Sequence, residues 1–441
     1  MTAGFMALLD VSIVNVAIPA LQGEFGASAS DISWVASGFA LTFAVTLVPA
    51  GRLGDERGRR RMLLLGIAAF TATSALCGLA PTPGWLVAGR LLQGAACGLM
   101  NPQVIGMIQQ LFPDASRARA LGLYGGVVAV STAIGPLVGG LLLQWADWRW
   151  VFVVNLPIGA VALVVGNRLL PTDPDDRPRR SLDLVGTALL GVVVLTVMYV
   201  LIEAEQGSTD WWLLAVGAVL LAAFLAWERR YRGQPLVDLG LLRDRGYSTG
   251  IVLALLYFAG YTGIFLVITL FLQQGLHYTP LQSGLSTVPI AIGSAITATY
   301  SGRLVFRLGR TLILTGILTT AAGVALAALL VDRGGPLLPL ALLITGLGSG
   351  LVFSPNQALA LRGVPPREGS TAGAVLQTCQ RIGTAIGTAL AGSLLFGELA
   401  RTHDFRPAAA LGLWGSALTL TLAAFAGAFT RRGRDLRREE E

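Results

Sequence analysis

The sequence is poor in the residues on which most catalytic and nucleotide-binding sites depend. It contains no lysine, so all 32 basic residues are arginine, and a Walker A phosphate loop, which needs a lysine, is excluded. There are two histidines and three cysteines, and Cys77, Cys97 and Cys379 lie in apolar segments without the spacing of a disulfide framework or a metal site. We therefore expect no enzyme, no ATP-driven chemistry and no metal or cofactor.

Charged residues are scarce as well. Only 13% of the 441 residues are charged, 54% are hydrophobic and the mean hydropathy is +0.67. Such a composition leaves too little polar surface to cover a globule in water. We therefore expect an all-α integral membrane protein that resides in a lipid bilayer and does not bind nucleic acid.

Apolar runs long enough to cross a membrane recur along the chain. About 20 residues span the hydrocarbon core, and we predict fourteen spans, centred in residues 2–22, 32–51, 62–80, 85–110, 118–143, 149–170, 184–203, 211–228, 247–272, 281–301, 311–331, 337–361, 370–397 and 408–430. By that segmentation, 26 of the arginines lie in connections on the side of the two termini. Because arginine is enriched in cytoplasmic loops, we predict a multi-pass protein of the cytoplasmic membrane with both termini in the cytoplasm. The first span starts almost at Met1, so we also expect a short basic segment to precede it in the native protein.

One apolar segment occurs twice. Residues 131–143 read STAIGPLVGGLLL, and residues 383–395, set 252 positions later, read GTAIGTALAGSLL. A self-match at this distance in an apolar chain indicates parallel repeats of the kind that transporters use. The distance exceeds six helices, so it predicts two six-helix bundles with two inserted helices between them. The predicted units are a first bundle over residues 1–170, a linker with the inserted helices over 171–246, a second bundle over 247–430 and a tail over 431–441.

The connection after the second span reads GRLGDERGRRRMLLLG. Its glycines permit a tight turn, its acid can meet a helix N-terminus or an arginine, and its arginines anchor the cytoplasmic face. This pattern resembles the signature loop of the major facilitator superfamily, and the resemblance implies a conformational latch between the two bundles. The alternative is a turn that only fixes topology. The candidate latch residues are Gly51, Asp55, Arg57, Gly58 and Arg59.

Two ionisable residues lie inside spans of the first half. Asp10 stands in LLDVSIVNVAIP and Arg90 in GRLLQGAACGLMNP, and a charge at mid-bilayer costs about 2.5 to 3.5 kcal/mol. Such residues are retained for function as a rule, and Asp10 could exchange a proton as its surroundings alternate. By family analogy Arg90 is its partner. A carboxylate near the interface and a static salt bridge are the structural alternatives.

The fifth span carries Gly135, Pro136, Gly139 and Gly140, a small-residue groove with a proline that weakens the helix locally. It resembles the antiporter signature of the superfamily, although Ser131 replaces one expected glycine. The repeat in the second half has lost this proline. Close helix packing alone is the alternative interpretation.

Together with WRWVFVVNLPIG at residues 148–159 and the inserted helices, these motifs resemble the fourteen-helix drug:proton antiporter branch of that superfamily. The resemblance implies two parallel six-helix bundles of the major facilitator fold with two inserted helices. It further implies a secondary transporter that exports small amphipathic organic compounds in exchange for protons by alternating access, and we expect a monomer. A proton-coupled importer remains the alternative.

The second half differs from cation exporters because no acidic residue lies in the middle of its spans, whereas Arg381 does. Arg381 is expected either to contact an anionic or carbonyl-bearing substrate or to pair with a polar neighbour. The mixture of aromatic and polar residues expected at the substrate cavity suits large amphipathic molecules. These candidates are Asn15, Trp34, Phe39, Gln93, Asn101, Gln103, Tyr257, Tyr261, Asn356, Gln377 and Arg381.

Overall fold

A computed structural model describes residues 2–26, 29–173, 183–205, 210, 212–231, 236–331 and 337–429. Helices make up the regular structure of this part of the chain, and it contains no strand. The predicted tail over 431–441 lies outside the described residues, as do residues 174–182, 206–209, 211 and 232–235 of the predicted linker.

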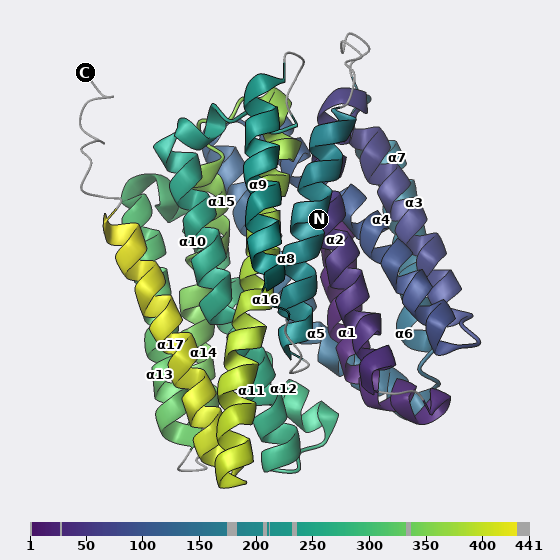
Figure 1. The fold of residues 1–441 in the computed structure, drawn as a ribbon, viewed down its shortest axis with the longest axis vertical. Coiled ribbons are helices and arrows are strands. Elements are labelled where there is room, and N and C mark those ends of the chain that lie inside the picture. The colour runs from purple at the N-terminus through teal and green to yellow at the C-terminus, as the bar shows by residue number, and fades with distance from the viewer. Residues whose placement is uncertain are drawn as a thin grey trace.

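The helices fall into three groups along the chain, which Figure 1 shows side by side, with the middle group lying between the other two in that view. The first half comprises α1 (Thr2–Phe25), α2 (Ala29–Arg57), α3 (Arg59–Gly78), α4 (Pro83–Leu111), α5 (Asp114–Trp145), α6 (Trp150–Val153) and α7 (Asn155–Leu169). The inserted pair is α8 (Leu184–Glu205) and α9 (Trp212–Arg230). The second half comprises η1 (Leu241–Arg243), α10 (Arg245–Tyr261), α11 (Gly263–Leu270), η2 (Phe271–Gly275), α12 (Pro280–Leu308), α13 (Arg310–Val331), α14 (Leu338–Gly350), α15 (Phe353–Ala360), η3 (Pro366–Glu368), α16 (Gly369–Thr402) and α17 (Phe405–Phe429).

Eleven helical segments within the described residues are long and apolar enough to cross a membrane, and Thr2–Ile18 adds a shorter apolar helix. The spans predicted at α4 and α12 are helices but are not among the eleven. Their sequences explain this, because α4 carries an arginine and several amides and α12 is rich in serine and threonine. The all-helical membrane fold is thus confirmed, whereas the count of fourteen spans stays a prediction.

Three of the predicted spans are interrupted helices. The span at 149–170 is divided at Val154 into α6 and α7, and the span at 337–361 is divided between α14 and α15. A proline follows each of these breaks, and Pro157 and Pro355 have no N–H for the carbonyl four residues earlier. The span at 247–272 is divided between α10 and α11, where the Thr262 hydroxyl donates to the carbonyls of Phe258 and Thr384 at 2.7 and 3.2 Å.

A glycine with a positive φ lies between two consecutive helices in each half. Gly58 separates α2 from α3 with a φ of 108°, and Gly309 separates α12 from α13 with a φ of 52°. Residues other than glycine rarely adopt a positive φ. Gly51, which we also assigned to the turn, lies inside α2 instead. Its lack of a side chain serves close packing, because an added Cβ would lie 2.8 Å from the Ser370 carbonyl oxygen of α16.

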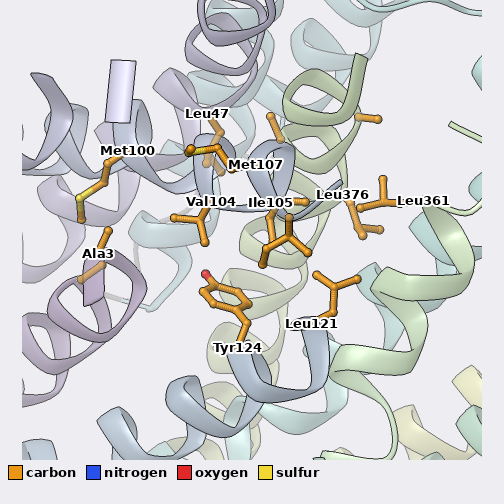
Figure 2. Packing of buried hydrophobic residues seen from close by; sticks show 14 of the residues in the cluster. Ala3, Leu47, Met100, Val104, Ile105, Met107, Leu121, Tyr124, Leu361 and Leu376 are labelled. Atoms are coloured by element: carbon orange, nitrogen blue, oxygen red, sulfur yellow. The ribbon is translucent and has the colours of Figure 1, made fainter. Parts of the chain in front are cut away.

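A buried apolar cluster joins the two halves. It includes Leu47, Ile105 and Leu121 of the first half together with Leu361 and Leu376 of the second half, each fully or almost fully buried. Figure 2 shows these side chains converging from α2, α4, α5 and α16 and, for Leu361, from the position that follows α15. Two further clusters lie within single halves. The contact between the halves is therefore apolar as well as polar.

The inserted helix α8 packs across the boundary between the halves. Its Val194, Met198 and Leu201 share a cluster with Leu41 of α2 and Ala385 of α16. Helix α9 packs against α8. The outer faces of the helices expose large apolar side chains, among them Val219 of α9 at 69% and Leu418 of α17 at 62%. Such faces suit contact with lipid rather than water.

A close approach of α2 and α4 gives a test of the packing. A Cβ added at Gly94 would meet the Phe39 carbonyl oxygen and the Thr42 hydroxyl of α2. We expect Gly94→Val to lower the free energy of unfolding by about 1 to 3 kcal/mol through overpacking. The control is Gly84→Val at the start of the same helix, where an added Cβ would meet nothing within 4 Å. Equal thermal unfolding midpoints of the two purified variants would contradict the expected close packing.

Candidate functional site

Asp10 on α1 lies in a fully buried polar network. Its Oδ2 accepts a hydrogen bond and ion pair from Arg90 Nη1 at 2.6 Å. Its Oδ1 accepts from Gln93 Nε2 at 3.1 Å and from Asn155 Nδ2 at 2.7 Å. All four residues are at most 1% exposed. The structure thus brings together Asp10 and Arg90, the two ionisable residues singled out in the first half.

The guanidinium of Arg90 is held from several sides. Its Nε donates to the Val35 carbonyl oxygen at 3.0 Å, and its Nη1 also donates to Gln93 Oε1 at 2.8 Å. The guanidinium carbon lies 4.2 Å from the centroid of the Phe39 ring, within the range of a cation–π contact. A buried ion pair is tolerated when further hydrogen bonds satisfy both ions, and removing one partner leaves an uncompensated charge. Asp10 and Arg90 therefore depend on each other.

Asn155 was not among the candidate residues. Besides Asp10 it donates to the Ser74 hydroxyl at 3.1 Å, and Ser74 in turn donates to the Phe152 carbonyl oxygen at 2.9 Å. The sequence offered one signal, since Asn155 is the amide within the apolar motif WRWVFVVNLPIG. A buried amide requires partners, but the pattern alone did not show that its partner is on α1.

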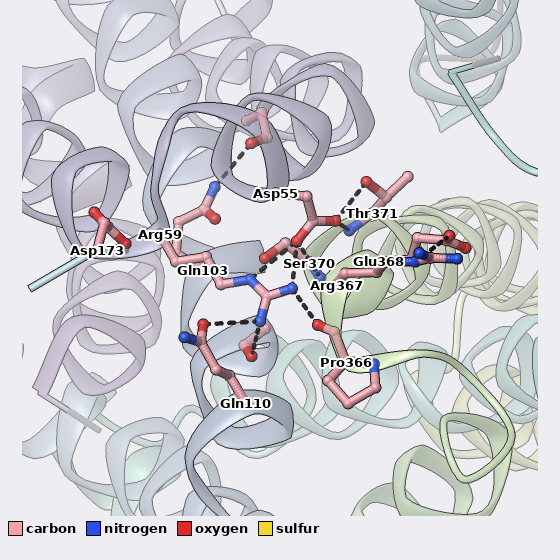
Figure 3. Close-up of polar contacts among 12 residues, drawn as sticks. Asp55, Arg59, Gln103, Gln110, Asp173, Pro366, Arg367, Glu368, Ser370 and Thr371 are labelled. Carbon is pink, nitrogen blue, oxygen red and sulfur yellow. Dashed lines mark hydrogen bonds and ion pairs between the residues drawn. The ribbon is translucent and has the colours of Figure 1, made fainter. Parts of the chain in front are cut away.

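Asp55, in the last turn of α2, connects this helix to the first turn of α16. Its Oδ2 accepts from the backbone N–H and the hydroxyl of Thr371, both at 2.8 Å, and its Oδ1 accepts from the N–H of Ser370 at 3.2 Å. The residue that precedes α16, Glu368, makes no side-chain cap. A carboxylate at a helix N-terminus satisfies free N–H groups and interacts favourably with the helix dipole. Asp55 thus caps α16 from the other half of the chain (Figure 3).

Arg59 completes this connection, which we call the interhalf latch and define by Asp55, Arg59, Ser370 and Thr371. Its Nε and Nη2 donate to Asp55 Oδ1 at 2.9 and 2.6 Å. It also donates to the carbonyl oxygen of Gly106 on α4 and to that of Pro366 in η3. Arg59 is 2% exposed. The buried ion pair therefore holds α2, α3, α4 and the start of α16 together.

The other signature-loop residues lie near the latch in different ways. Gly58 forms the turn, and Asp173 accepts from the N–H groups of Arg60 and Arg61 at 3.2 and 3.1 Å at the start of α3. Arg57 is exposed, and it makes no hydrogen bond or ion pair with any residue that the structure describes. The structure therefore does not place Arg57 in the latch.

The glycine motif of α5 contacts two helices on two faces. An added Cβ would meet Ser12 of α1 at Gly135, and would lie 3.4 Å from Ile13 of α1 at Gly139. On the other face, an added Cβ at Gly140 would lie 3.7 Å from Leu281 of α12. Pro136 lies on this face, against Gly284 of α12. Helix α5 nevertheless runs unbroken through Pro136.

The repeated segment of α16 makes the corresponding contact in the second half. An added Cβ at Gly387 would meet the Ala259 carbonyl oxygen of α10, and one at Gly383 would meet the Leu255 carbonyl oxygen. Each copy of the repeat therefore packs its glycines against the first helix of its own half. The copy in α5 additionally places Pro136 and Gly140 against the opposite half.

Arg381 of α16 reaches toward the first half. Its guanidinium carbon lies 4.6 Å from the centroid of the Phe43 ring on α2. Cys97 of α4 and Tyr124 of α5 are its electrostatic neighbours. Asn101 joins these two, because it accepts from the Tyr124 hydroxyl at 3.1 Å and donates to the Cys97 sulfur at 3.5 Å. Among the described residues, Arg381 makes no ion pair with a carboxylate.

Gln377 lies one helical turn before Arg381, so the two share a face of α16. Gln377 is 6% exposed, and its buried Nε2 has no hydrogen-bond acceptor in the described part of the chain. Arg381 itself is partly exposed. Arg381, Gln377, Phe43, Tyr124 and Asn101 thus form a mixed aromatic and polar group contributed by both halves.

The remaining cavity candidates do not all join this group. Gln103 donates to the Ala50 carbonyl oxygen at 2.8 Å, and Asn356 to the Gly250 carbonyl oxygen at 2.9 Å, so both amides connect neighbouring helices. Tyr257 and Tyr261 stack on each other with ring centroids 5.3 Å apart. Gln93 and Phe39 belong to the Asp10–Arg90 network, where Gln93 donates to Asp10 and the Phe39 ring lies against Arg90. Trp34 packs on the apolar cluster that α8 shares with α2 and α16. Asn15 lies at an exposed position of α1. A single cavity wall of all eleven residues was therefore too broad an expectation, because buried amides require hydrogen bonds wherever helices meet.

Comparisons with known proteins agree on one family. The family model described as Major Facilitator Superfamily matches residues 1–388. The probable actinorhodin transporter of Streptomyces coelicolor is 37% identical over 414 residues, which cover 90% of this chain and 71% of that protein. Multidrug resistance protein Stp of Mycobacterium tuberculosis is 34% identical over 409 residues, covering 91% and 75%. The crystal structure of the human organic anion transporter MFSD10 (TETRAN) superposes with a TM-score of 0.71 at 16% identity and covers 97% of both chains.

Proposed function

Because the chain belongs to the Major Facilitator Superfamily and is a membrane transporter, not an enzyme, we propose that it exports amphipathic organic compounds from the cytoplasm in exchange for protons. Relatives named as a probable actinorhodin transporter and a multidrug resistance protein support the substrate class, and one named as a tetracenomycin C resistance and export protein supports the direction. The proposal extends to fourteen spans in the cytoplasmic membrane, both termini in the cytoplasm and a monomeric transporter.

The observation that carries the proton step is the buried ion pair of Asp10 with Arg90. Asp10 takes up a proton when the transporter faces outward, and this weakens its hold on Arg90. When the site faces the cytoplasm, Arg90 again favours the charged carboxylate, and the proton leaves. Each positive charge that moves inward contributes about 2.3 kcal/mol per 100 mV.

The motion that links proton and substrate is a rocking of residues 1–170 against residues 247–430. The interhalf latch supports this, since it joins the two units through hydrogen bonds that can be exchanged for water. In the arrangement described here the latch is formed, and the transporter must release it before its cytoplasmic side opens. The small-residue face of α5 against α12 provides a smooth surface along which the units move.

Transport in proteoliposomes tests the proposal. With protein reconstituted in random orientation and the lumen made acidic, we expect ethidium, rhodamine 6G or 9-anthracenecarboxylate to accumulate inside, and the accumulation to stop when a protonophore dissipates the gradient. Empty liposomes and a protein with Asp10→Asn are the controls. Accumulation only when the lumen is alkaline would indicate a proton-coupled importer. Gradient-independent equilibration of all three probes would contradict proton coupling.

A further inference from the structure

We propose that Arg381 and Gln377 form a receptor for the negatively charged group of a planar aromatic substrate, so that the preferred cargo is an aromatic organic anion. This inference rests on the proposed transport function and assigns its substrate class. It follows from the charge, the unused hydrogen-bond donors and the aromatic neighbours of one face of α16.

Arg381 differs from the two buried arginines in how its charge is balanced. Arg59 and Arg90 each pair with a carboxylate at 2.6 Å. Arg381 contacts a phenyl ring instead, and within the described ranges no Asp or Glu forms an ion pair with it. A cation in a poorly solvated site is unfavourable unless a counter-charge is supplied. A bound anion supplies that charge.

The face of α16 that carries Arg381 also has a hydrogen-bond donor to spare. Gln377 presents a buried amide Nε2 that has no acceptor among the described residues, and it lies one turn from Arg381. A buried donor without an acceptor is unfavourable. A carboxylate, enolate or phenolate oxygen accepts several hydrogen bonds at once. One such group placed between the two side chains would satisfy both.

The scarcity of acidic residues in the second half disfavours a cationic cargo beside Arg381. Between Arg245 and Glu398 the described part of the second half contains one acidic residue, Glu368, which precedes α16 at the end where the latch lies. A positively charged drug placed at Arg381 would meet a like charge and no carboxylate of the second half. Electrostatic repulsion of this kind gives specificity against the wrong ligand.

The aromatic side chains around Arg381 favour a ligand with a planar aromatic ring system. Phe43 lies against the guanidinium of Arg381, and Tyr124 of α5 is a further neighbour. Tyr124 in turn faces Phe353 of α15 at a centroid distance of 6.5 Å. Aromatic side chains favour stacked or edge-to-face contacts with another ring. A flat ring system whose anionic group is directed at Arg381 would have Phe43 and Tyr124 as aromatic neighbours.

Equilibrium binding to the purified full-length protein in nanodiscs tests the inference without depending on transport. The probes are 9-anthracenecarboxylate, the neutral 9-anthracenecarboxamide and the cationic 9-(aminomethyl)anthracene, which share one ring system. We expect the parent to bind the carboxylate about tenfold or more tightly than the amide, the effect of one charge-assisted hydrogen bond. The cation should bind most weakly. Empty nanodiscs correct for partition into lipid.

Two pairs of variants localise the effect. Arg381→Gln should bind the carboxylate and the amide equally, whereas Arg381→Lys should keep part of the preference. Gln377→Glu should weaken carboxylate binding about tenfold and improve binding of the cation, because it places a negative charge beside the ligand. The matched controls are Arg307→Gln on α12 and Gln274→Glu in η2, both exposed positions of the second half, and both should bind like the parent.

The outcomes separate the two proposals. If Arg381→Gln binds the carboxylate as tightly as the parent does, or if the parent prefers the cation, the anion receptor is wrong even when proton-driven transport is observed. If the parent binds the carboxylate through Arg381 but moves none of the probes across proteoliposomes, the receptor stands and the transport proposal fails. Arg381→Lys and Gln377→Glu keep the test decisive should Arg381→Gln prove too unstable to purify.

Discussion

Replacing Asp10 by asparagine should abolish proton-driven transport and lower the free energy of unfolding by about 3 to 5 kcal/mol. The carboxylate accepts hydrogen bonds from Arg90, Gln93 and Asn155 in a site with no exposed surface at Asp10. Asparagine keeps the shape but not the charge, so Arg90 is left as a buried cation without a counter-ion. Arg90→Gln should have an effect of similar size, because it leaves Asp10 unpaired.

A double variant separates the structural role of this pair from its role in coupling. In Asp10→Leu/Arg90→Met both charges are gone, and buried ion pairs replaced by apolar residues of similar volume often retain or gain stability. We expect the thermal unfolding midpoint of the double variant to return toward that of the parent, while transport driven by a pH gradient stays absent. Recovery of gradient-driven transport in the double variant would show that the pair is only structural.

Asp55→Asn should release the interhalf latch. The substitution removes the charge that pairs with Arg59 and interacts with the N-terminus of α16. Charge-assisted hydrogen bonds contribute about 1.5 to 3 kcal/mol each, so we expect the latched arrangement to lose at least tenfold in population relative to the open one. Transport should fall accordingly, because a transporter that no longer closes on the cytoplasmic side returns slowly to its outward-facing state.

Cysteine labelling measures the latch directly. Ser370 is 0% exposed, so Ser370→Cys in a protein with Cys77, Cys97 and Cys379 replaced by alanine reports on opening. A membrane-impermeant maleimide added to everted vesicles should label this cysteine slowly, and at least tenfold faster when Asp55→Asn is added. Arg57→Gln, at the exposed last residue of α2, is the control and should leave the rate unchanged. Equal labelling rates with aspartate and asparagine at position 55 would refute the latch.

The sequence was most informative about features that are local in the chain. Apolar runs gave the helices, since a span must satisfy its own backbone hydrogen bonds and present apolar side chains to lipid. Gly58 was correctly placed in the turn, because a left-handed backbone angle strongly favours glycine. Even so, the breaks at Val154 and between α14 and α15 were missed, although Pro157 and Pro355 mark them. A proline interrupts the helix but leaves the run long and apolar, so the hydropathy pattern does not reveal the break.

The sequence was least informative about buried polar residues. Gln103, Asn356 and Arg381 looked alike as polar residues in apolar helices. The first two donate to carbonyl oxygens of neighbouring helices, whereas the contact of Arg381 within the described residues is with the Phe43 ring. Which partner a side chain meets depends on helix rotation and on contacts between residues far apart in the chain. For the same reason Asn155 was not recognised as a hydrogen-bond partner of Asp10.

The sequence by itself determined that this chain is a helical membrane protein with a repeated plan, and that the second copy of the repeat has lost the proline of the first. Its composition and its internal match are enough for both conclusions. Only the tertiary structure decided that Asp55 caps α16 of the opposite half, that Asp10 and Arg90 share one buried network, and that Arg381 faces an aromatic ring. The first two of these pairings join residues that are 316 and 80 positions apart, and only the packing of helices brings such distant residues together.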